Sequence, residues 1–520
     1  MSDRPPARRS GELTLRELAR FSWRQLTSMR TALVLLLLLA LASVPGSVIP
    51  QEDVDSLKAS QWQDKHDTLT PIYEKLGLFD VYGSPWFAAI YLLLVLSLVG
   101  CIVPRTFVYA RGIRAQPPRA PRHLTRMPDH TTYTTGAPPD EVLAEARRVL
   151  RRKGYRLRAE PDGDGTSVSS ERGYLREVGN LVFHLAVLVV LVGFALGGLL
   201  GYKGGVILVT GSTFGNNPTQ YDDFVPGSLF RADRMDDFRF RVEKFDVDWV
   251  TSGTRTGMAR NFEADVRYRE AGGDEKQYDL RVNHPLTIGG TELFLIGHGY
   301  APVVTVKDGN GDVTYSGPTV FLPQGPDLMS FGVIKAPDAE PRQIGLEGFL
   351  YPSFYMTPDG DPANLYGAAT NPLLSLNLYT GDLGLDDGVS QSVYVLDKSR
   401  AEAVPGKNGQ AFRVDLRVGE TETLPDGLGS ITFDDMYSWQ RIQISQTPGK
   451  RIALAGVVLA LLGLMGSLFI RSRRVWVRAT VTPDGTLVEV AALERSGGGD
   501  IRSVLEDLVE SLRSAEEEKA

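Results

Sequence analysis

Four long apolar segments constrain the fold of this 520-residue chain more than any other feature of its sequence. None of them contains Lys, Arg, Asp or Glu, and each falls within the roughly 17–25 residues that a membrane-spanning helix needs. One such segment can be a helix in the core of a soluble protein, but four in one chain are typical of a membrane protein. The sequence therefore predicts spans at Thr31–Val48, Pro85–Val103, Gly179–Leu200 and Ile452–Ile470.

The distribution of arginine orients these spans. The leader, residues 1–30, is rich in arginine, the segment 49–84 is acidic, the loop 104–178 is basic, and the last span runs into the sequence RSRR. Basic loops stay in the cytoplasm. Both termini, the loop 104–178 and the tail 471–520 are thus predicted to be cytoplasmic, with the loop 49–84 and residues 201–450 outside the plasma membrane. We expect the first span to be uncleaved, because it lacks the small-residue pattern of a signal-peptide cleavage site.

The cytoplasmic segments have short elements of their own. In the leader, Thr14 and Glu17 have the spacing of a capping box, and an amphipathic helix that follows either lies on the inner membrane face or packs on the protein. The loop is predicted to form strands at 130–135, 155–160 and 166–172 and a helix at 138–154, and the tail a hairpin at 475–493 followed by an amphipathic helix. Because each piece is small, we expect the loop and tail to form one α+β unit.

The region 201–450 has the pattern of a β domain. Apolar residues alternate in Phe238–Val250, with a register shift before Phe245, and the segments 261–270 and 276–282 form a predicted hairpin around Gly272-Gly273. Residues 320–375 are rich in Pro and Gly and are predicted to be loops. The expected fold is a multi-pass membrane protein with four transmembrane helices, a large extracytoplasmic mostly-β domain of the sandwich or barrel type, and a small cytoplasmic α+β portion.

The sequence contains no motif that indicates an autonomous catalytic activity. The sequence has no phosphate-binding glycine loop, no GxSxG, no HExxH and no clustered metal ligands, so we predict no catalytic residue. The single cysteine, Cys101, excludes an internal disulfide and a CxxC pair, and we interpret it as a packing residue. His284 and His298 are isolated; they are either metal or haem ligands or, more commonly beside Pro and Gly, partners in turn hydrogen bonds. His66, in the first outer loop, is a similar case.

His184 is the only histidine inside the four apolar segments. An ionisable residue in a span needs a partner and is a candidate for function. At 1.5 Å per residue it lies roughly 7–8 Å inside the span, on the cytoplasmic side. Asn180 shares its helix face, whereas Gly193 and Gly197 form a GxxxG pattern on the opposite face that lets another span approach. Two interpretations remain: His184 is an axial haem ligand, or it donates to a carbonyl of a neighbouring span.

Three segments resemble one known family. The sequences LTSMRTALVLLLLLALASVPGSVIPQ (26–51), GYLREVGNLVFHLAVLVVLVG (173–193) and VNHPLTIGGTELFLIGHGYAP (282–302) are similar to those of ResB-type cytochrome c biogenesis proteins, the smaller membrane subunit of the system II cytochrome c synthase. The order of the spans around a large outer domain is also that of the family. The segment 303–440 contributes least to the resemblance.

The resemblance implies a partner, a ResC/CcsA-type multi-span haem-handling protein. Together the two subunits would carry haem b outward and support its attachment to apocytochrome c, whose thiols a thioredoxin-like reductant keeps reduced. This chain would be a non-catalytic subunit that holds haem transiently, with His184 as axial ligand. From its place on the same helix face, and not from the resemblance, Asn180 is expected to orient the ring of His184. No other metal and no nucleic acid is expected. Two alternatives stay open: a scaffold whose β domain captures apocytochrome c without haem, and a membrane transporter, which the lack of matching broken spans disfavours.

Overall fold

The computed structural model describes residues 14–52, 54, 56–159, 165–250, 252–384, 393–398, 400–406, 410–494 and 501–517. It divides into two compact units. The helical unit comprises Met1–Ala195 and Gly449–Ala520, and the β unit comprises Leu196–Pro448. The N-terminal part of the predicted leader, residues 1–13, lies outside the described residues.

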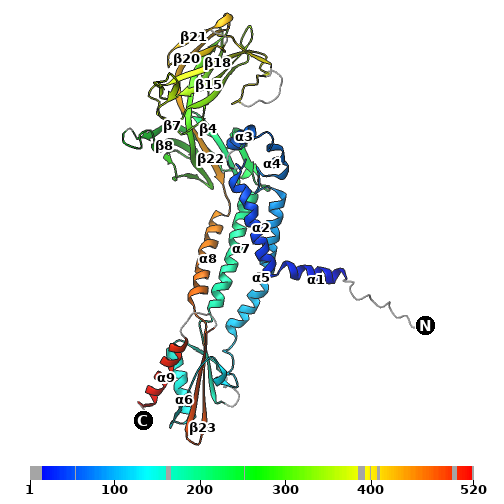
Figure 1. Ribbon diagram of the computed structural model, residues 1–520, viewed down its shortest axis with the longest axis vertical. Coiled ribbons are helices and arrows are strands. Elements are labelled where there is room, and N and C mark those ends of the chain that lie inside the picture. Colours follow the sequence, from blue (N-terminus) through cyan, green and yellow to red (C-terminus); the bar gives the residue numbers. More distant parts are fainter. Residues whose placement is uncertain are drawn as a thin grey trace, which may run out of the picture. The chain divides into compact units, whose positions relative to one another are not determined.

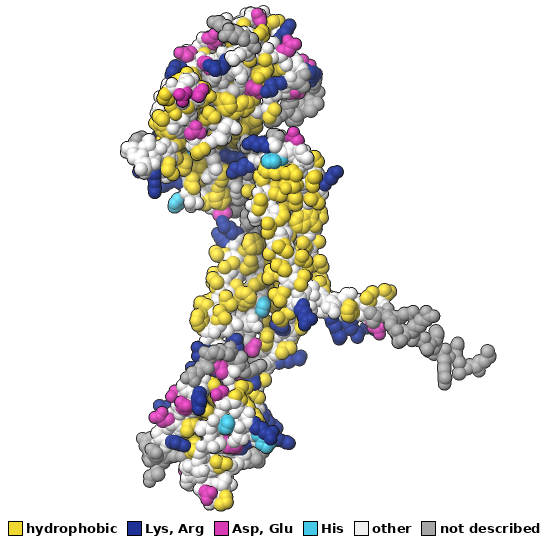
Figure 2. Space-filling model, viewed as in Figure 1, with side chains coloured by type: hydrophobic (Ala, Val, Ile, Leu, Met, Phe, Trp, Pro, Cys, Tyr) yellow, Lys and Arg dark blue, Asp and Glu magenta, His cyan; other side chains and the backbone are white. Residues whose placement is uncertain are grey.

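Four helices are long and apolar enough to cross a membrane, which confirms the expected number of spans in the described part of the chain. Hydrophobic side chains cover their visible surface (Figure 2). The helices are α2 (Met29–Val48), α5 (Pro85–Arg114), α7 (Arg176–Leu200) and α8 (Lys450–Phe469). The side chain of Ser28 accepts a hydrogen bond from the first turn of α2, and that of Ser84 accepts one from the first turn of α5, as N-caps do.

Helices α7 and α8 run side by side (Figure 1) and meet through small residues. Gly179, Ala186 and Gly193, seven residues apart, are the buried residues of α7. They lie against Ala453 and the glycines of α8, so the two backbones touch. Gly193 therefore takes the predicted role. Gly197 instead faces Thr447, in the segment before α8.

Helix α5 is tied to its neighbours by hydrogen bonds to their backbone. Tyr91 Oη donates to the carbonyl of Leu191 in α7 at 3.0 Å, and Ser97 Oγ donates to that of Leu26 at 2.6 Å. Leu26 ends α1 (Leu15–Leu26), which has the predicted capping box. No residue of α1 is buried, and Leu15 is 86% exposed. The apolar side of α1 is thus not covered by the described part of the protein.

The segment between the first two spans contains two short helices that the sequence did not predict, α3 (Ser56–Lys65) and α4 (Thr70–Leu76). Aromatic rings hold them together: Trp62 stacks on Tyr73 with ring centroids 5.2 Å apart and meets Phe79 edge-on at 5.4 Å. His66 stacks on Trp62 and shares a hydrogen bond with its carbonyl through Nδ1. The ring of His66 therefore has a structural role.

The loop 104–178 and the tail combine into one five-stranded sheet of order β1-β24-β23-β3-β2, which confirms the expected α+β unit. The second and third strands in this order, β24 and β23, come from the tail and pair with strands of the loop, and two helices bury their apolar faces on the sheet. Strand β2, predicted at 155–160, comprises only Arg156–Leu157. The elements are β1 (Asp129–Thr135), α6 (Pro139–Arg152), β2 (Arg156–Leu157), β3 (Ser167–Arg172), β23 (Arg473–Thr482), β24 (Gly485–Glu494) and α9 (Ile501–Glu517).

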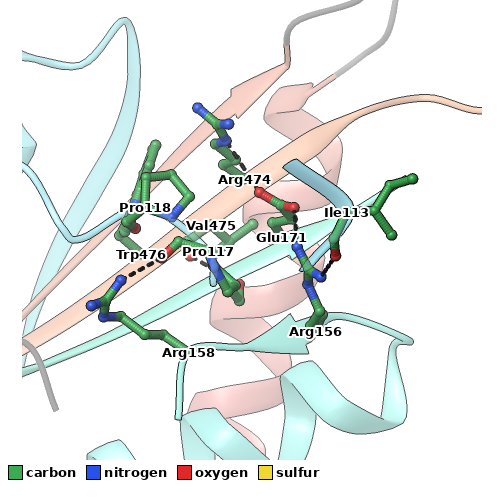
Figure 3. A network of polar contacts seen from close by, with 10 residues as sticks. Ile113, Pro117, Pro118, Arg156, Arg158, Glu171, Arg474, Val475 and Trp476 are labelled. Atoms are coloured by element: carbon green, nitrogen blue, oxygen red, sulfur yellow. Dashed lines mark hydrogen bonds and ion pairs between the residues drawn. The ribbon is translucent and has the colours of Figure 1, made fainter. Parts of the chain in front are cut away.

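Polar contacts fasten the end of α5 to this sheet (Figure 3). Arg156 pairs with Glu171 at 2.8 Å and donates to the carbonyl of Ile113 at 2.6 Å. Trp476 Nε1 donates to the carbonyl of Pro118 at 3.2 Å. Both the last turn of α5 and the proline-rich linker after it are therefore fixed to the α+β unit.

The described residues of the β unit form three larger sheets. The seven-stranded sheet has the order β10-β11-β22-β4-β6, with β12 and β21 at its side; the four-stranded sheet is β5-β7-β8-β9; and the six-stranded sheet is β13-β14-β15-β18-β19, with β20 added. One apolar core lies between the first and second sheets, and another between the first and third. Two long strands, β11 (Thr291–Lys307) and β22 (Gly429–Gln446), contribute to both cores and join them.

The other strands of this unit are short to medium in length. The first two sheets contain β4 (Tyr202–Val209), β5 (Thr213–Gly215), β6 (Asp223–Pro226), β7 (Phe238–Trp249), β8 (Ala259–Glu270), β9 (Glu275–Arg281), β10 (Leu286–Ile288), β12 (Val313–Pro318) and β21 (Thr421–Leu424). The rest contain β13 (Leu322–Pro323), β14 (Ser330–Ala336), β15 (Gln343–Tyr351), β16 (Phe354–Met356), β17 (Pro362–Asn364), β18 (Leu373–Gly381), β19 (Ala401–Ala403) and β20 (Arg413–Leu416).

The strands predicted around Phe238–Val250 and the hairpin after them are confirmed, and the register shift before Phe245 is a β-bulge. The prediction of loops throughout 320–375 is wrong. Strands β14 and β15 lie within it, and β15 is paired on both edges. Because both strands have buried residues on consecutive positions, they lack the alternation that marks a half-buried strand.

Candidate functional site

A pocket of about 410 Å³ lies among α2, α5 and α7, inside the apolar part of the helical unit. Aliphatic side chains form most of its wall, including Leu36 of α2 and Leu94 of α5. His184 lies in the wall formed by α7. A largely apolar pocket with a few polar groups is the usual form of a small-molecule or cofactor site.

His184 faces away from the contact between α7 and α8. The small residues of α7 meet α8, whereas Leu181, Phe183, His184 and Val187 line the pocket. The imidazole meets the ring of Phe183 edge-on, at 5.3 Å between centroids. Within the described part of the chain, neither ring nitrogen makes a hydrogen bond. The interpretation that His184 donates to a carbonyl of a neighbouring span therefore finds no acceptor in the described residues.

Asn180 is not among the residues that line the pocket in the described structure. It lies one turn before His184 in α7, as the sequence requires, but the wall near it is formed by Leu181 and Phe183. The structure thus brings His184 into a pocket without bringing Asn180 into the same wall.

Sequence reasoning missed two polar residues of the pocket, Arg105 and Tyr109. The predicted second span ends at Val103, but α5 continues to Arg114 and keeps both residues on the face of Cys101, at four-residue spacing. Arg105 Nη2 donates to Met29 Sδ at 3.0 Å, and a thioether is only a weak acceptor. A guanidinium so placed has donors left for a carboxylate. The spacing 101, 105, 109 was the signal that could have identified these residues.

The thiol of Cys101 also lines the pocket but is used within the chain, since its Sγ donates to the carbonyl of Thr27 at 2.7 Å. A group of three or more His, Cys, Asp or Glu side chains that could hold a metal ion is absent from the described residues. An isolated imidazole in an apolar wall suits a metal that already has its other ligands, as haem iron does.

The two histidines of the β unit differ. His284 is exposed in a tight turn, where its backbone N–H donates to the carbonyl of Arg281 at 3.0 Å. His298 is largely buried beside a pocket, with its ring 5.4 Å from that of Phe245 and 5.0 Å from that of Phe262. Burial lowers the pKa of His298 to about 4, so its imidazole is neutral at pH 7.

Comparison with known proteins gives a family for this architecture. Residues 29–504 match the model of the ResB-like family. The chain is 22% identical over 487 residues to the cytochrome c biogenesis protein ResB of Bacillus subtilis, which covers 88% of this chain and 81% of that protein.

Two cyanobacterial proteins named cytochrome c biogenesis protein CcsB are also similar. Identity is 26% over 335 residues with that of a Synechococcus strain, covering 61% of this chain and 67% of the relative. It is 28% over 285 residues with that of Thermosynechococcus vestitus, covering 54% and 60%. The match thus spans about two thirds or less of these CcsB proteins. With its family match across most of the sequence and its four apolar helices, the chain belongs to the ResB-like family.

Proposed function

We propose that this chain is a subunit of a system II cytochrome c biogenesis complex, and that the pocket around His184 holds haem b on its way across the membrane. Its relatives ResB and CcsB carry the name cytochrome c biogenesis protein. The observation that carries the proposal is the imidazole of His184: it lines an apolar pocket within a span and has no hydrogen-bond partner in the described chain. A polar group in that medium requires a partner, which a ligand or a second subunit supplies.

The groups around the pocket match the chemistry of haem. The macrocycle is flat and apolar, and the aliphatic side chains of α2 and α5 together with Phe183 provide a surface for it. The imidazole of His184 supplies one nitrogen ligand to the iron. The guanidinium of Arg105, at the cytoplasmic end of the same pocket, pairs with a haem propionate. The residues of this pocket would therefore bind and orient the cargo.

The proposal extends to topology and partners. The arginine distribution supports a topology in which both termini and the α+β unit are cytoplasmic and the β unit is outside. Haem entering from the inner leaflet would bind at His184, with a second axial ligand from a ResC/CcsA-type multi-span partner. Attachment to the thiols of apocytochrome c, which a thioredoxin-like protein keeps reduced, then requires mainly that haem and acceptor be held in register.

The test is the visible absorption spectrum of the chain purified together with its multi-span partner. His184→Ala should insert and fold, because no buried charge is created, yet it should co-purify with much less haem and mature little cytochrome c. Leu185→Ala is the matched control: it lies in the same turn of α7 but is exposed and does not line the pocket. Added imidazole should partly restore His184→Ala, but not His184→Leu, whose side chain fills the vacant position.

Full haem content and normal cytochrome c in His184→Ala would refute the ligand role. The alternative in which the β unit captures apocytochrome c while the partner holds all the haem would then be favoured.

A further inference from the structure

The β unit has a second pocket, of about 580 Å³, between β11 and the four-stranded sheet. Its wall is mainly aromatic and aliphatic, and includes Phe245, Phe262 and Phe294. At its rim Ile296 is 49% exposed, so the pocket is accessible from solvent. Arg281, at the end of β9, also lines it. Pockets of about 300–1,000 Å³ with this composition bind small molecules.

A β-bulge places His298 in this pocket. Leu295 pairs with Ile442 of β22, but the next pair is Gly297 with Arg441, so Ile296 is an extra residue in β11. Because of this extra residue, the alternation of side chains between the two faces of the sheet is shifted by one position after Ile296. As a result His298 points to the side that Leu293 and Leu295 occupy, toward the four-stranded sheet, and its ring contacts two phenylalanines there.

The imidazole of His298 makes no hydrogen bond within the described chain. A ring nitrogen of an imidazole that has no hydrogen-bond partner is free to bind a metal. Directly opposite it in β22 is Gln440, which is fully buried. Gln440 Nε2 donates to Thr210 and Ser438, whereas its Oε1 has no partner among the described residues. An unpaired acceptor thus lies on the strand position next to an unpaired imidazole.

We propose that this pocket is a second haem-binding site of the chain, in which His298 is an axial ligand, Gln440 Oε1 accepts the other ring N–H, and Arg281 pairs with a propionate. A histidine that ligates a metal normally donates its other N–H to an oxygen, and this oxygen sets the tautomer. Arg281 is available at the rim, since its ion pair with Glu263 is long, 3.8 Å, and largely exposed. The inference rests on the proposed function, because it takes the cargo to be haem.

The class of ligand follows from the groups present. Aromatic walls favour a flat apolar ring, a lone histidine favours a metal whose remaining ligands are already provided, and a cation at the rim favours a carboxylate. An iron porphyrin with propionates has all three features. A purely apolar peptide segment would use the walls but would leave His298 and Gln440 unpaired.

The experiment is a titration of the full-length chain in nanodiscs with haemin, followed by the Soret band, in a His184→Ala background that removes the proposed membrane site. His298→Ala should weaken binding about tenfold or more, since the iron–nitrogen bond is lost. His284→Ala is the matched control, a histidine of the same unit that does not line this pocket, and should bind as the parent does. Metal-free protoporphyrin should bind the parent and His298→Ala with equal affinity, because it forms no bond to His298.

Ile296→Glu is a second test of the pocket, in case His298→Ala does not fold. It adds a carboxylate at an exposed rim position without removing a buried side chain. It should also weaken haemin binding, with unchanged thermal unfolding. The proposal is overturned if His298→Ala titrates like the parent, or if haemin and metal-free porphyrin lose affinity equally. It is also overturned if a haem-free apocytochrome peptide fills the pocket and His298→Ala leaves the haemin spectrum unchanged. Since His184 is absent throughout, failure here is distinguishable from failure of the membrane site.

Discussion

Gly193 of α7 and Ala453 of α8 are in backbone contact: a Cβ placed on Gly193 would lie 2.7 Å from the backbone nitrogen of Ala453. Gly193→Leu should therefore force the two helices apart and lower the stability of the helical unit by about 1–3 kcal/mol, the usual cost of overpacking. Gly198→Leu is the control, because a Cβ there meets nothing within 4 Å. Thermal unfolding of the purified chain measures both; equal midpoints would show that α7 and α8 do not pack through Gly193.

Arg105→Gln should reduce the affinity of the membrane pocket for haem about tenfold or more, because a charge-assisted bond to a propionate contributes about 1.5–3 kcal/mol. The matched control is Arg111→Gln, in the same helix but exposed and outside the pocket. Haem content relative to protein, read from the Soret band of the complex, is the measurement. An unchanged ratio of haem to protein in Arg105→Gln would show that Arg105 does not pair with a haem propionate.

Asn180→Ala should lower haem content less than His184→Ala does. Asn180 lies one turn from His184 but does not line the pocket in the described structure, so any influence on the imidazole is indirect. The comparison uses the same spectra, normalised to protein. A loss as large as that of His184→Ala would show that Asn180 contacts the ring or the haem directly.

The orientation of the chain can be tested with topology reporters. Fusions at residues 60 and 300 should be active only outside the cytoplasm, and fusions at 140 and 510 only inside, because basic segments stay on the cytoplasmic side. The four apolar helices separate these positions. A cytoplasmic signal from the fusion at 300 would invert the placement of the β unit and end the proposed direction of haem transfer.

The pH dependence of the β unit should carry a contribution from His298. Its pKa is about 4 in the folded protein against an ordinary value of 6.5, so the unfolded chain binds the proton more tightly. This contribution to the free energy of unfolding is fully present above pH 6.5, falls as the pH drops toward 4, and amounts to about 3 kcal/mol at most. Denaturant unfolding of the parent and of His298→Phe should diverge across that window; parallel pH profiles would contradict it.

Much of the local structure follows from the sequence. The four spans could be predicted because the hydrocarbon layer imposes a rule on each segment separately: a helix of sufficient length without charges. The capping box of Thr14 and Glu17 and the hairpin of β8 and β9 depend on residues close together in the chain. His184 could be identified as a candidate because a polar side chain inside a membrane span costs free energy whatever its neighbours are.

Tertiary structure decided the remainder. Strands β14 and β15 are buried on consecutive positions, so their hydrophobic pattern carries no period of two, and only the sheets around them define them as strands. The pairing of β3 with β23 joins residues about 300 positions apart, which no local pattern encodes. The pocket of His184 needs α2 and α5 to supply its other walls, and that of His298 needs one extra residue at Ile296 to turn its side chain inward. In each case the deciding energy is burial between segments distant in the sequence, which local patterns do not contain.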